Sequence, residues 1–185
     1  MELILVRHPE TVVPRGTCYG ASDVAADEAH LAEAVTRLAP QLPKGARFVS
    51  SPQQRARVLA EALAGGAVET DARLKEVDFG DWEMRVWDDL PRAEIDAWSA
   101  DFYGYVPPNG ESMGAMGART LDWWASVEGH DGTLVAVAHG GPWRALAAHL
   151  TGAGLENALR FELAWGRMAR FERRRHGVRM TAWGV

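Results

Sequence analysis

Two of the six histidines in this chain come directly after an apolar run and directly before a residue that breaks regular structure. His8 ends the stretch ELILVRH and precedes Pro9, and His139 ends TLVAVAH and precedes Gly140. An unprotonated imidazole has one nucleophilic ring nitrogen and one N–H donor. The C-terminal ends of parallel strands share one edge of a sheet, where ligands bind. We therefore predict that, if their strands are neighbours, His8 and His139 face each other across a cleft at that edge.

Two arginines belong to the same pattern. Arg7 immediately precedes His8, and Arg55 follows the Ser-Ser-Pro that closes the stretch ARFVSSP. Guanidinium groups hold phosphoryl oxygens through forked hydrogen bonds. Taken singly, each histidine fits an ordinary loop residue and Arg55 fits a solvated helix residue. The joint pattern instead predicts a compact cationic pocket for a phosphoryl group.

The elements that must position these residues alternate along the chain. Apolar, strand-like stretches cover residues 2–7, 46–52, 68–74 and 133–141, and two further β-like segments cover 167–174 and 178–185. Helical patterns cover residues 29–42, 53–65, 91–102, 112–129, 141–152 and 155–164. Near-continuous apolar strands are typical of parallel sheets that are covered on both faces. The sequence therefore predicts an α/β fold, a three-layer sandwich whose mainly parallel sheet is flanked by helices on both faces, with an antiparallel pair at its end.

Size and composition limit the classes of function. The 185 residues, 47% of them hydrophobic, suffice for one sizeable core, and we predict one domain over residues 1–185, with residues 75–110 as an excursion over the active-site edge. A net charge of −5 argues against a nucleic-acid partner. The single cysteine, Cys18, fits a reducing compartment. No apolar run of about 18 residues or signal peptide is evident, so we expect a cytoplasmic protein without a membrane partner. A homodimer is compatible with the sequence.

Four motifs carry a family resemblance. LVRHPET, SSPQQRA, LKEVDFGDWE and VAHGG, in this order and spanning roughly residues 2–145, resemble the histidine phosphatase superfamily, the phosphoglycerate mutase-like group. The resemblance implies a phosphohistidine mechanism in which His8 is the nucleophile, while Arg7, Arg55 and His139 hold the phosphoryl oxygens. It implies no metal and no cofactor.

The proton donor to the leaving alcohol has two candidates. Glu76, in Leu74-Lys75-Glu76, matches the family's position, and Glu83 lies seven residues further along the same segment. We favour Glu76 on motif position alone. An ordinary loop or helix-start carboxylate is the alternative interpretation of Glu83.

The resemblance is strongest to the alpha-ribazole phosphatase branch, whose members dephosphorylate a nucleotide-like intermediate in cobalamin assembly. Cys18-Tyr19-Gly20-x-Ser22-Asp23, DFGDWE and Pro-x-Gly-Glu-Ser carry it. The expected partner is a small phosphomonoester, and the expected contacts beyond the catalytic groups come from Thr11, Tyr19, Gly20 and Gly140. Tyr19, Trp82 or Trp87 could stack on a flat leaving group. A broad-specificity phosphatase and a mutase are the alternatives within the enzyme class.

Two positions depart from the family pattern. Pro9 replaces the glycine of Arg-His-Gly and removes a backbone N–H, and Pro14 stands where the family often has a phosphate-contacting asparagine. These changes leave room for a non-catalytic module that binds a phosphorylated ligand. A third alternative is an iron centre made by His8, His139 and Glu76, although the adjacent arginines would repel a divalent cation.

Overall fold

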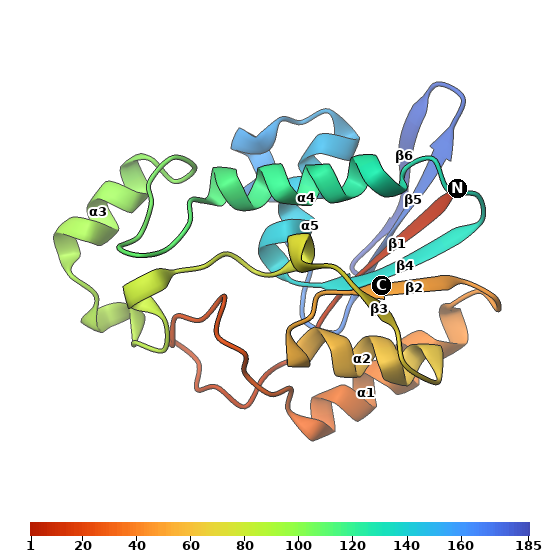
Figure 1. The fold of residues 1–185 in the computed structure, drawn as a ribbon, viewed down its shortest axis with the longest axis horizontal. Coiled ribbons are helices and arrows are strands. Elements are labelled where there is room, and N and C mark those ends of the chain that lie inside the picture. The colour runs from red at the N-terminus through yellow and green to blue at the C-terminus, as the bar shows by residue number, and fades with distance from the viewer.

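Six strands form one mixed sheet in the order β3-β2-β4-β1-β5-β6 in the computed structural model, which describes residues 1–185 (Figure 1). The strands are β1 (Glu2–Arg7), β2 (Arg47–Ser50), β3 (Glu69–Thr70), β4 (Thr133–Ala138), β5 (Met168–Arg174) and β6 (Gly177–Trp183). The first four run parallel, and β5 and β6 are antiparallel to their neighbours. The predicted fold class and its antiparallel end are confirmed, and β1 and β4 are neighbours.

Helices cover both faces of the sheet because the side chains of its central strands alternate between two apolar cores. Leu3 and Leu5 pack under α4 (Met113–Val127) and α5 (Gly140–Thr151). Ile4 and Val6 pack against α1 (Glu28–Leu38) and α2 (Gln54–Ala64) on the other face. The two helix layers lie above and below the sheet in Figure 1. A strand that is apolar on both sides thus specifies a three-layer arrangement.

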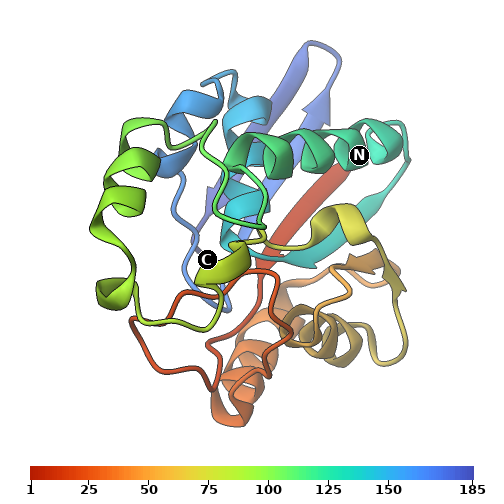
Figure 2. The ribbon, with the colours of Figure 1, turned by 60° about the vertical axis from the view of Figure 1, so that its left-hand side comes forward.

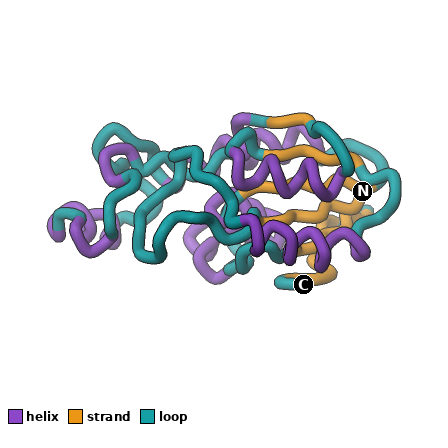
Figure 3. The backbone as a smooth tube through the Cα atoms, turned by 90° about the horizontal axis from the view of Figure 1, so that it is seen from below, coloured by secondary structure: helices purple, strands orange, loops and turns teal.

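Residues 76–110, with α3 (Arg92–Ala100), extend beyond the C-terminal ends of the parallel strands, as Figures 1 and 3 show. An aromatic cluster holds this segment together; it comprises Cys18, Phe79, Trp82, Trp87, Leu90, Ile95, Trp98 and Tyr105. Trp82 is fully buried and its indole N–H donates to Glu94, while Trp87 stacks on Trp98. Trp82 therefore packs the segment and is not available to stack on a ligand. That residues 1–185 form one domain stays a prediction.

Two predicted elements are wrong in extent. Only Glu69–Thr70 of the segment 68–74 is a strand, because Asp71 caps a 3-10 turn at Ala72–Leu74. The predicted helix at 155–164 is a 3-10 helix that ends at Arg160. Beyond Arg160 the chain is no longer helical. There the carbonyls of Glu162 and Leu163 accept hydrogen bonds from the side chains of Trp183 and Arg7.

α1 ends at Leu38, four residues before its predicted end, where the chain enters a 3-10 turn. The other helices begin and end within about two residues of prediction, and Ser112 caps α4 as expected. Further 3-10 turns cover Ala39–Gln41, Gly80–Trp82 and Trp87–Asp89. None of the helices combines the length and the apolar character needed to cross a membrane.

Candidate active site

The two strand-end histidines meet at the carboxyl edge of the sheet. Arg7 of β1 lies opposite Ala138 of β4 in the parallel register, so the residue after each strand occupies the same row. The ring centroids of His8 and His139 are 5.1 Å apart, and the rings are 3% and 0% exposed. The pair therefore lies inside the protein, at the point where the sheet order passes from β1 to β4.

His8 is the candidate nucleophile. Its Nδ1 lies 2.6 Å from the Pro9 carbonyl, to which Nδ1–H donates, and this leaves the Nε2 lone pair free. Burial, followed by the charges of Arg55 and Arg7, lowers the pKa of His8 well below its usual 6.5, so the ring is neutral. Residue 9 holds the His8 ring through its backbone carbonyl, and proline has this group as glycine does, so Pro9 preserves the contact.

His139 is held in the complementary orientation. Its Nε2 lies 2.8 Å from Ser51 Oγ, which also accepts the Gln53 N–H at 3.3 Å. When the Ser51 hydroxyl donates to Nε2, the proton of the neutral ring resides on Nδ1, and that atom is buried without a protein partner. Burial and the nearby Arg55 lower the pKa of His139 well below 6.5 as well. Sequence reasoning missed Ser51, although it is part of the Ser-Ser-Pro motif.

The two guanidinium groups are braced by backbone carbonyls. Arg7 Nη1 donates to Leu163 at 2.7 Å, and the two terminal nitrogens of Arg55 donate to Ser22 and Gly20 at 2.8 and 2.7 Å. The Nε of each arginine is buried and has no protein partner. Buried donors are rarely left unpaired, so these two N–H groups and His139 Nδ1 together indicate a site for an anion with several oxygens.

The Glu76 carboxylate lies at the start of α5. Both of its oxygens are 3.2 Å from the Gly141 amide nitrogen, and one accepts the Val77 N–H at 3.1 Å. A Cβ at position 141 would come within 2.2 Å of this carboxylate, so the close approach requires glycine. The side chain is half-buried, and its charge raises the pKa of Arg7 and Arg55 against the effect of burial. Glu76 thus adjoins the cationic pocket with access to solvent.

Glu83 is occupied elsewhere. Its two oxygens accept hydrogen bonds from the backbone of Gly20, Ala21, Ser22 and Phe79 and from the Ser22 hydroxyl. Burial raises its pKa, but these hydrogen bonds outweigh burial and lower the pKa overall, so the carboxylate is ionised. The geometry gives Glu83 the task of fixing the loop at 20–22 and leaves Glu76 as the candidate proton donor.

The remaining predicted contact residues divide into two groups. Thr11 donates to the Tyr19 hydroxyl at 3.1 Å, and the Tyr19 ring lies 5.3 Å from Arg55 Cζ, so both lie beside the pocket. Gly140 packs against Arg7, whose Cζ would be 3.3 Å from an added Cβ. Gly20 has both backbone groups bonded, to Glu83 and Arg55, and its substrate contact stays a prediction.

The iron-centre alternative loses support. No group of three or more His, Cys, Asp or Glu side chains is arranged to bind one metal ion, which removes the geometry expected for an iron centre.

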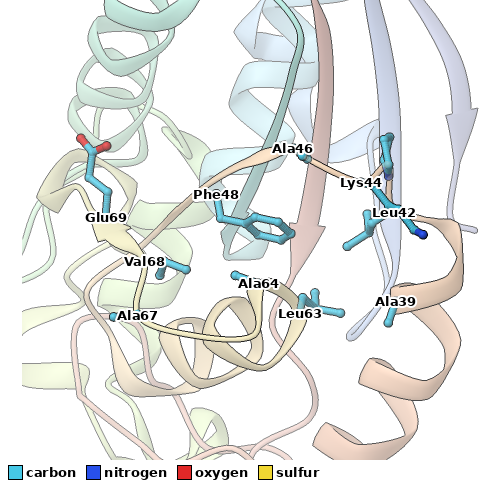
Figure 4. A pocket seen from close by; sticks show the side chains of 12 residues that line it. Ala39, Leu42, Lys44, Ala46, Phe48, Leu63, Ala64, Ala67, Val68 and Glu69 are labelled. Atoms are coloured by element: carbon cyan, nitrogen blue, oxygen red, sulfur yellow. The ribbon is translucent and has the colours of Figure 1, made fainter.

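The largest cavity, about 580 Å³, is lined by apolar side chains including Phe48, Leu63 and Val68 (Figure 4). It adjoins the start of β2, at the end of that strand away from Ser51, so it is not part of the histidine site.

The two buried imidazoles predict a specific pH dependence of stability. Their pKa values are depressed in the folded state, so the unfolded chain takes up protons near pH 6.5 while the folded chain does not. The stability they contribute is complete above pH 6.5 and falls below it by up to about 1.4 kcal/mol per pH unit for each histidine. Urea unfolding between pH 7.5 and 5.5 measures this slope. We expect His8→Asn to reduce the slope by about half, and an unchanged slope would contradict the assignment.

Comparison with known proteins agrees with this geometry. The model of the histidine phosphatase superfamily (branch 1) matches residues 3–185. The chain belongs to this superfamily. It is 31% identical to the adenosylcobalamin/alpha-ribazole phosphatase of Salmonella typhimurium over 161 residues, which cover 81% of this chain and 79% of that protein. It is 32% identical to the glucosyl-3-phosphoglycerate phosphatase of Mycolicibacterium vanbaalenii over 180 residues, 84% of this chain and 76% of that one.

Among solved structures of the superfamily, the alpha-ribazole phosphatase from Shigella flexneri superposes with a TM-score of 0.90 at 26% identity, covering 100% of this chain and 96% of that chain. A further relative, from Hydrogenobacter thermophilus, is 33% identical over 115 residues, and this chain spans 57% of its length. The similarity supports a histidine-based phosphatase. Identities near 30% to proteins with different substrates leave the specific activity to be argued from the site.

Proposed function

We propose that the protein hydrolyses phosphomonoesters through a phosphohistidine on His8. The observation that carries this proposal is the free Nε2 of a neutral His8 beside three buried, unpaired N–H donors, those of Arg7, Arg55 and His139. A phosphoryl group has the several oxygens that such donors require. A neutral imidazole next to them has both the lone pair and the electrostatic surroundings for attack on phosphorus.

The reaction follows in two steps. In the first, His8 Nε2 forms a bond to phosphorus while the bond from phosphorus to the leaving oxygen breaks, and Glu76 gives its proton to that oxygen. In the second, Glu76 takes a proton from water, whose oxygen attacks phosphorus and displaces His8, which releases inorganic phosphate. Arg7, Arg55 and the Nδ1–H of His139 stabilise the charge on the equatorial oxygens in both steps.

The experiment that tests the mechanism is chemical trapping. Mixing the enzyme with a ³²P-labelled phosphomonoester and quenching within one turnover should leave label on the protein that is stable in alkali, labile in acid and absent from His8→Ala. A module that only binds the ligand would give no label. A mutase would require a bisphosphorylated primer for turnover, and hydrolysis without a primer excludes it.

For the substrate, the finer proposal is an alpha-ribazole phosphatase. The near-complete superposition on the Shigella enzyme and the similarity to the Salmonella enzyme support it. The alternative is a phosphatase of broad specificity. A turnover screen over alpha-ribazole phosphate, sugar phosphates and phosphoglycerates compares the two, since a preference of less than about tenfold would favour the alternative. We propose a cytoplasmic location with this role.

A matched pair of substitutions separates the two glutamates. Glu76→Gln should lower kcat by about 10²–10³-fold for an alkyl phosphate, whose alkoxide must be protonated on leaving, and by much less for p-nitrophenyl phosphate, whose leaving group needs no proton. Glu83→Gln, the control, should loosen the loop at 20–22 and affect both substrates to the same extent. Steady-state kinetics on the two substrates measure the ratio. A leaving-group dependence in Glu83→Gln instead would reverse the assignment.

A further inference from the structure

A second cavity, about 380 Å³ in volume, adjoins the phosphoryl pocket. Loop residues 10–17, except Val12, form one part of its lining, and Tyr19 and Trp165 form the other. The same two rings stack with the catalytic guanidiniums: Trp165 lies 5.1 Å from Arg7 Cζ, and Tyr19 lies 5.3 Å from Arg55 Cζ. Each ring therefore contacts both the phosphoryl clamp and this cavity. The loop and the neighbouring excursion lie side by side in Figures 1 and 2.

We propose that this cavity binds the leaving group, that it selects an uncharged alcohol carrying a planar ring, and that Trp165 determines this specificity. The proposal rests on the proposed function, because it names the class of substrate for the same site. It assigns a role to Trp165 and Arg15, which lie outside the motifs of the histidine site.

The charges in the lining disfavour an acidic leaving group. The cavity has one cation, Arg15, whose Nε and Nη2 each lie 3.0 Å from Glu10 Oε1. Glu10 also faces His30 at 3.5 Å, and its side chain is more buried than that of Arg15. The arginine is thus paired, while a carboxylate in the cavity would meet Glu10 without a free cation to offset the repulsion. Arg7 and Arg55 are not part of the cavity lining.

The rest of the lining fits a planar, largely apolar group. Val13 and Pro14 contribute apolar surface, and Pro14 has no N–H to offer a ligand oxygen. Two aromatic faces next to the reacting centre provide the stacking surfaces that sequence-tolerant base-binding sites use. Pro14, which departs from the family pattern, thus belongs to the wall of this cavity.

A ratio of specificity constants tests the role of Trp165. Adenosine 5′-monophosphate carries a neutral ring-bearing leaving group, and glycerol 3-phosphate carries a compact neutral one. We expect kcat/KM for the first to exceed that for the second by at least about tenfold, and Trp165→Ala to lower this ratio about tenfold, as the loss of one stacking partner does. Trp165→Phe should keep the ratio within about threefold. Because a disturbed Arg7 would slow both substrates equally, the ratio reports on the cavity alone.

A second substitution tests the argument that the cavity disfavours a negatively charged leaving group. 3-Phosphoglycerate, whose leaving alcohol carries a carboxylate, should be the poorest of the three substrates. Glu10→Gln frees Arg15 and should raise kcat/KM for 3-phosphoglycerate about threefold relative to glycerol 3-phosphate, the scale of an exposed ion pair. Arg15→Gln should not produce this gain.

Failure of this inference differs from failure of the proposed function. If Trp165→Ala slows both neutral substrates equally, or if 3-phosphoglycerate is the best substrate, the leaving-group cavity is wrong while hydrolysis stands. If the wild-type protein hydrolyses none of the three and acquires no label on His8, the proposed function itself is wrong.

Discussion

His8→Ala should lower kcat for p-nitrophenyl phosphate by at least about 10⁴-fold while the protein stays folded. The substitution removes Nε2, the atom that we propose forms the bond to phosphorus, and His139 cannot replace it because its own Nε2 is bonded to Ser51. The oxygens of the substrate would still meet Arg7, Arg55 and His139, so binding should persist while chemistry stops.

The design of this measurement must separate chemistry from folding, because His8 is buried. His8→Asn supplies a side chain that can still donate to the Pro9 carbonyl, and it should be as inactive as His8→Ala. His130→Ala, at an exposed position, is the matched control and should retain wild-type turnover. Circular dichroism and the thermal midpoint establish folding, and inhibition by inorganic phosphate reports binding. Turnover at the wild-type rate in His8→Ala would refute the mechanism.

Arg55→Ala should lower kcat/KM by about 10³-fold, close to 4 kcal/mol of transition-state stabilisation. The residue supplies a buried N–H to the phosphoryl site and also ties Gly20 and Ser22 together, so its removal takes away a charge and frees two carbonyls of the loop. Arg55→Lys tests the geometry, since an ammonium keeps the charge but cannot donate to both carbonyls and to the phosphoryl group at fixed angles. We expect Lys to recover less than about a tenth of the lost activity.

Arg57→Ala is the control for this pair, because Arg57 lies two residues further along α2 and pairs with Glu61 on the partly exposed face of the helix. Its kcat/KM should stay within about twofold of wild type. Equal losses in Arg55→Ala and Arg57→Ala would indicate damage to the helix instead of loss of a phosphoryl contact. Full activity in Arg55→Lys would mean that charge alone suffices.

The part of the site that could be predicted from sequence is the part that topology places. Arg7, His8 and His139 follow parallel strands, and Arg55 follows a strand-to-helix turn, so a single rule about sheet edges brings them together. The same rule gives the fold, because the apolar periodicity of the strands specifies which faces are covered. The periodicity of apolar residues shows on which face of its own helix or strand a side chain lies.

The residues that sequence reasoning missed act through contacts that have no period. Ser51 reaches His139 across 88 positions, and Leu163 offers its carbonyl to Arg7 across 156. Trp165 lies between the helix predicted at 155–164 and the β-like segment predicted from 167, where the sequence predicts no element. The helix itself ends at Arg160, four residues earlier than predicted. The task of Glu83 could not be predicted either, because four of its donors are backbone N–H groups, which every residue type except proline possesses.

Gln53 links the two chemical halves of the site through one side-chain amide. Its nitrogen donates to the Gly20 carbonyl that braces Arg55, and its oxygen accepts the backbone N–H of Glu76. Arg55 and Glu76 are thus held through the same Gln53 side chain, so a displacement of one is transmitted to the other. The lining of the leaving-group cavity at residues 10–17 makes no hydrogen bond with this side chain. Substitutions at residues 10–17 can therefore change substrate specificity among related chains, while the residues that carry out the chemistry keep their arrangement.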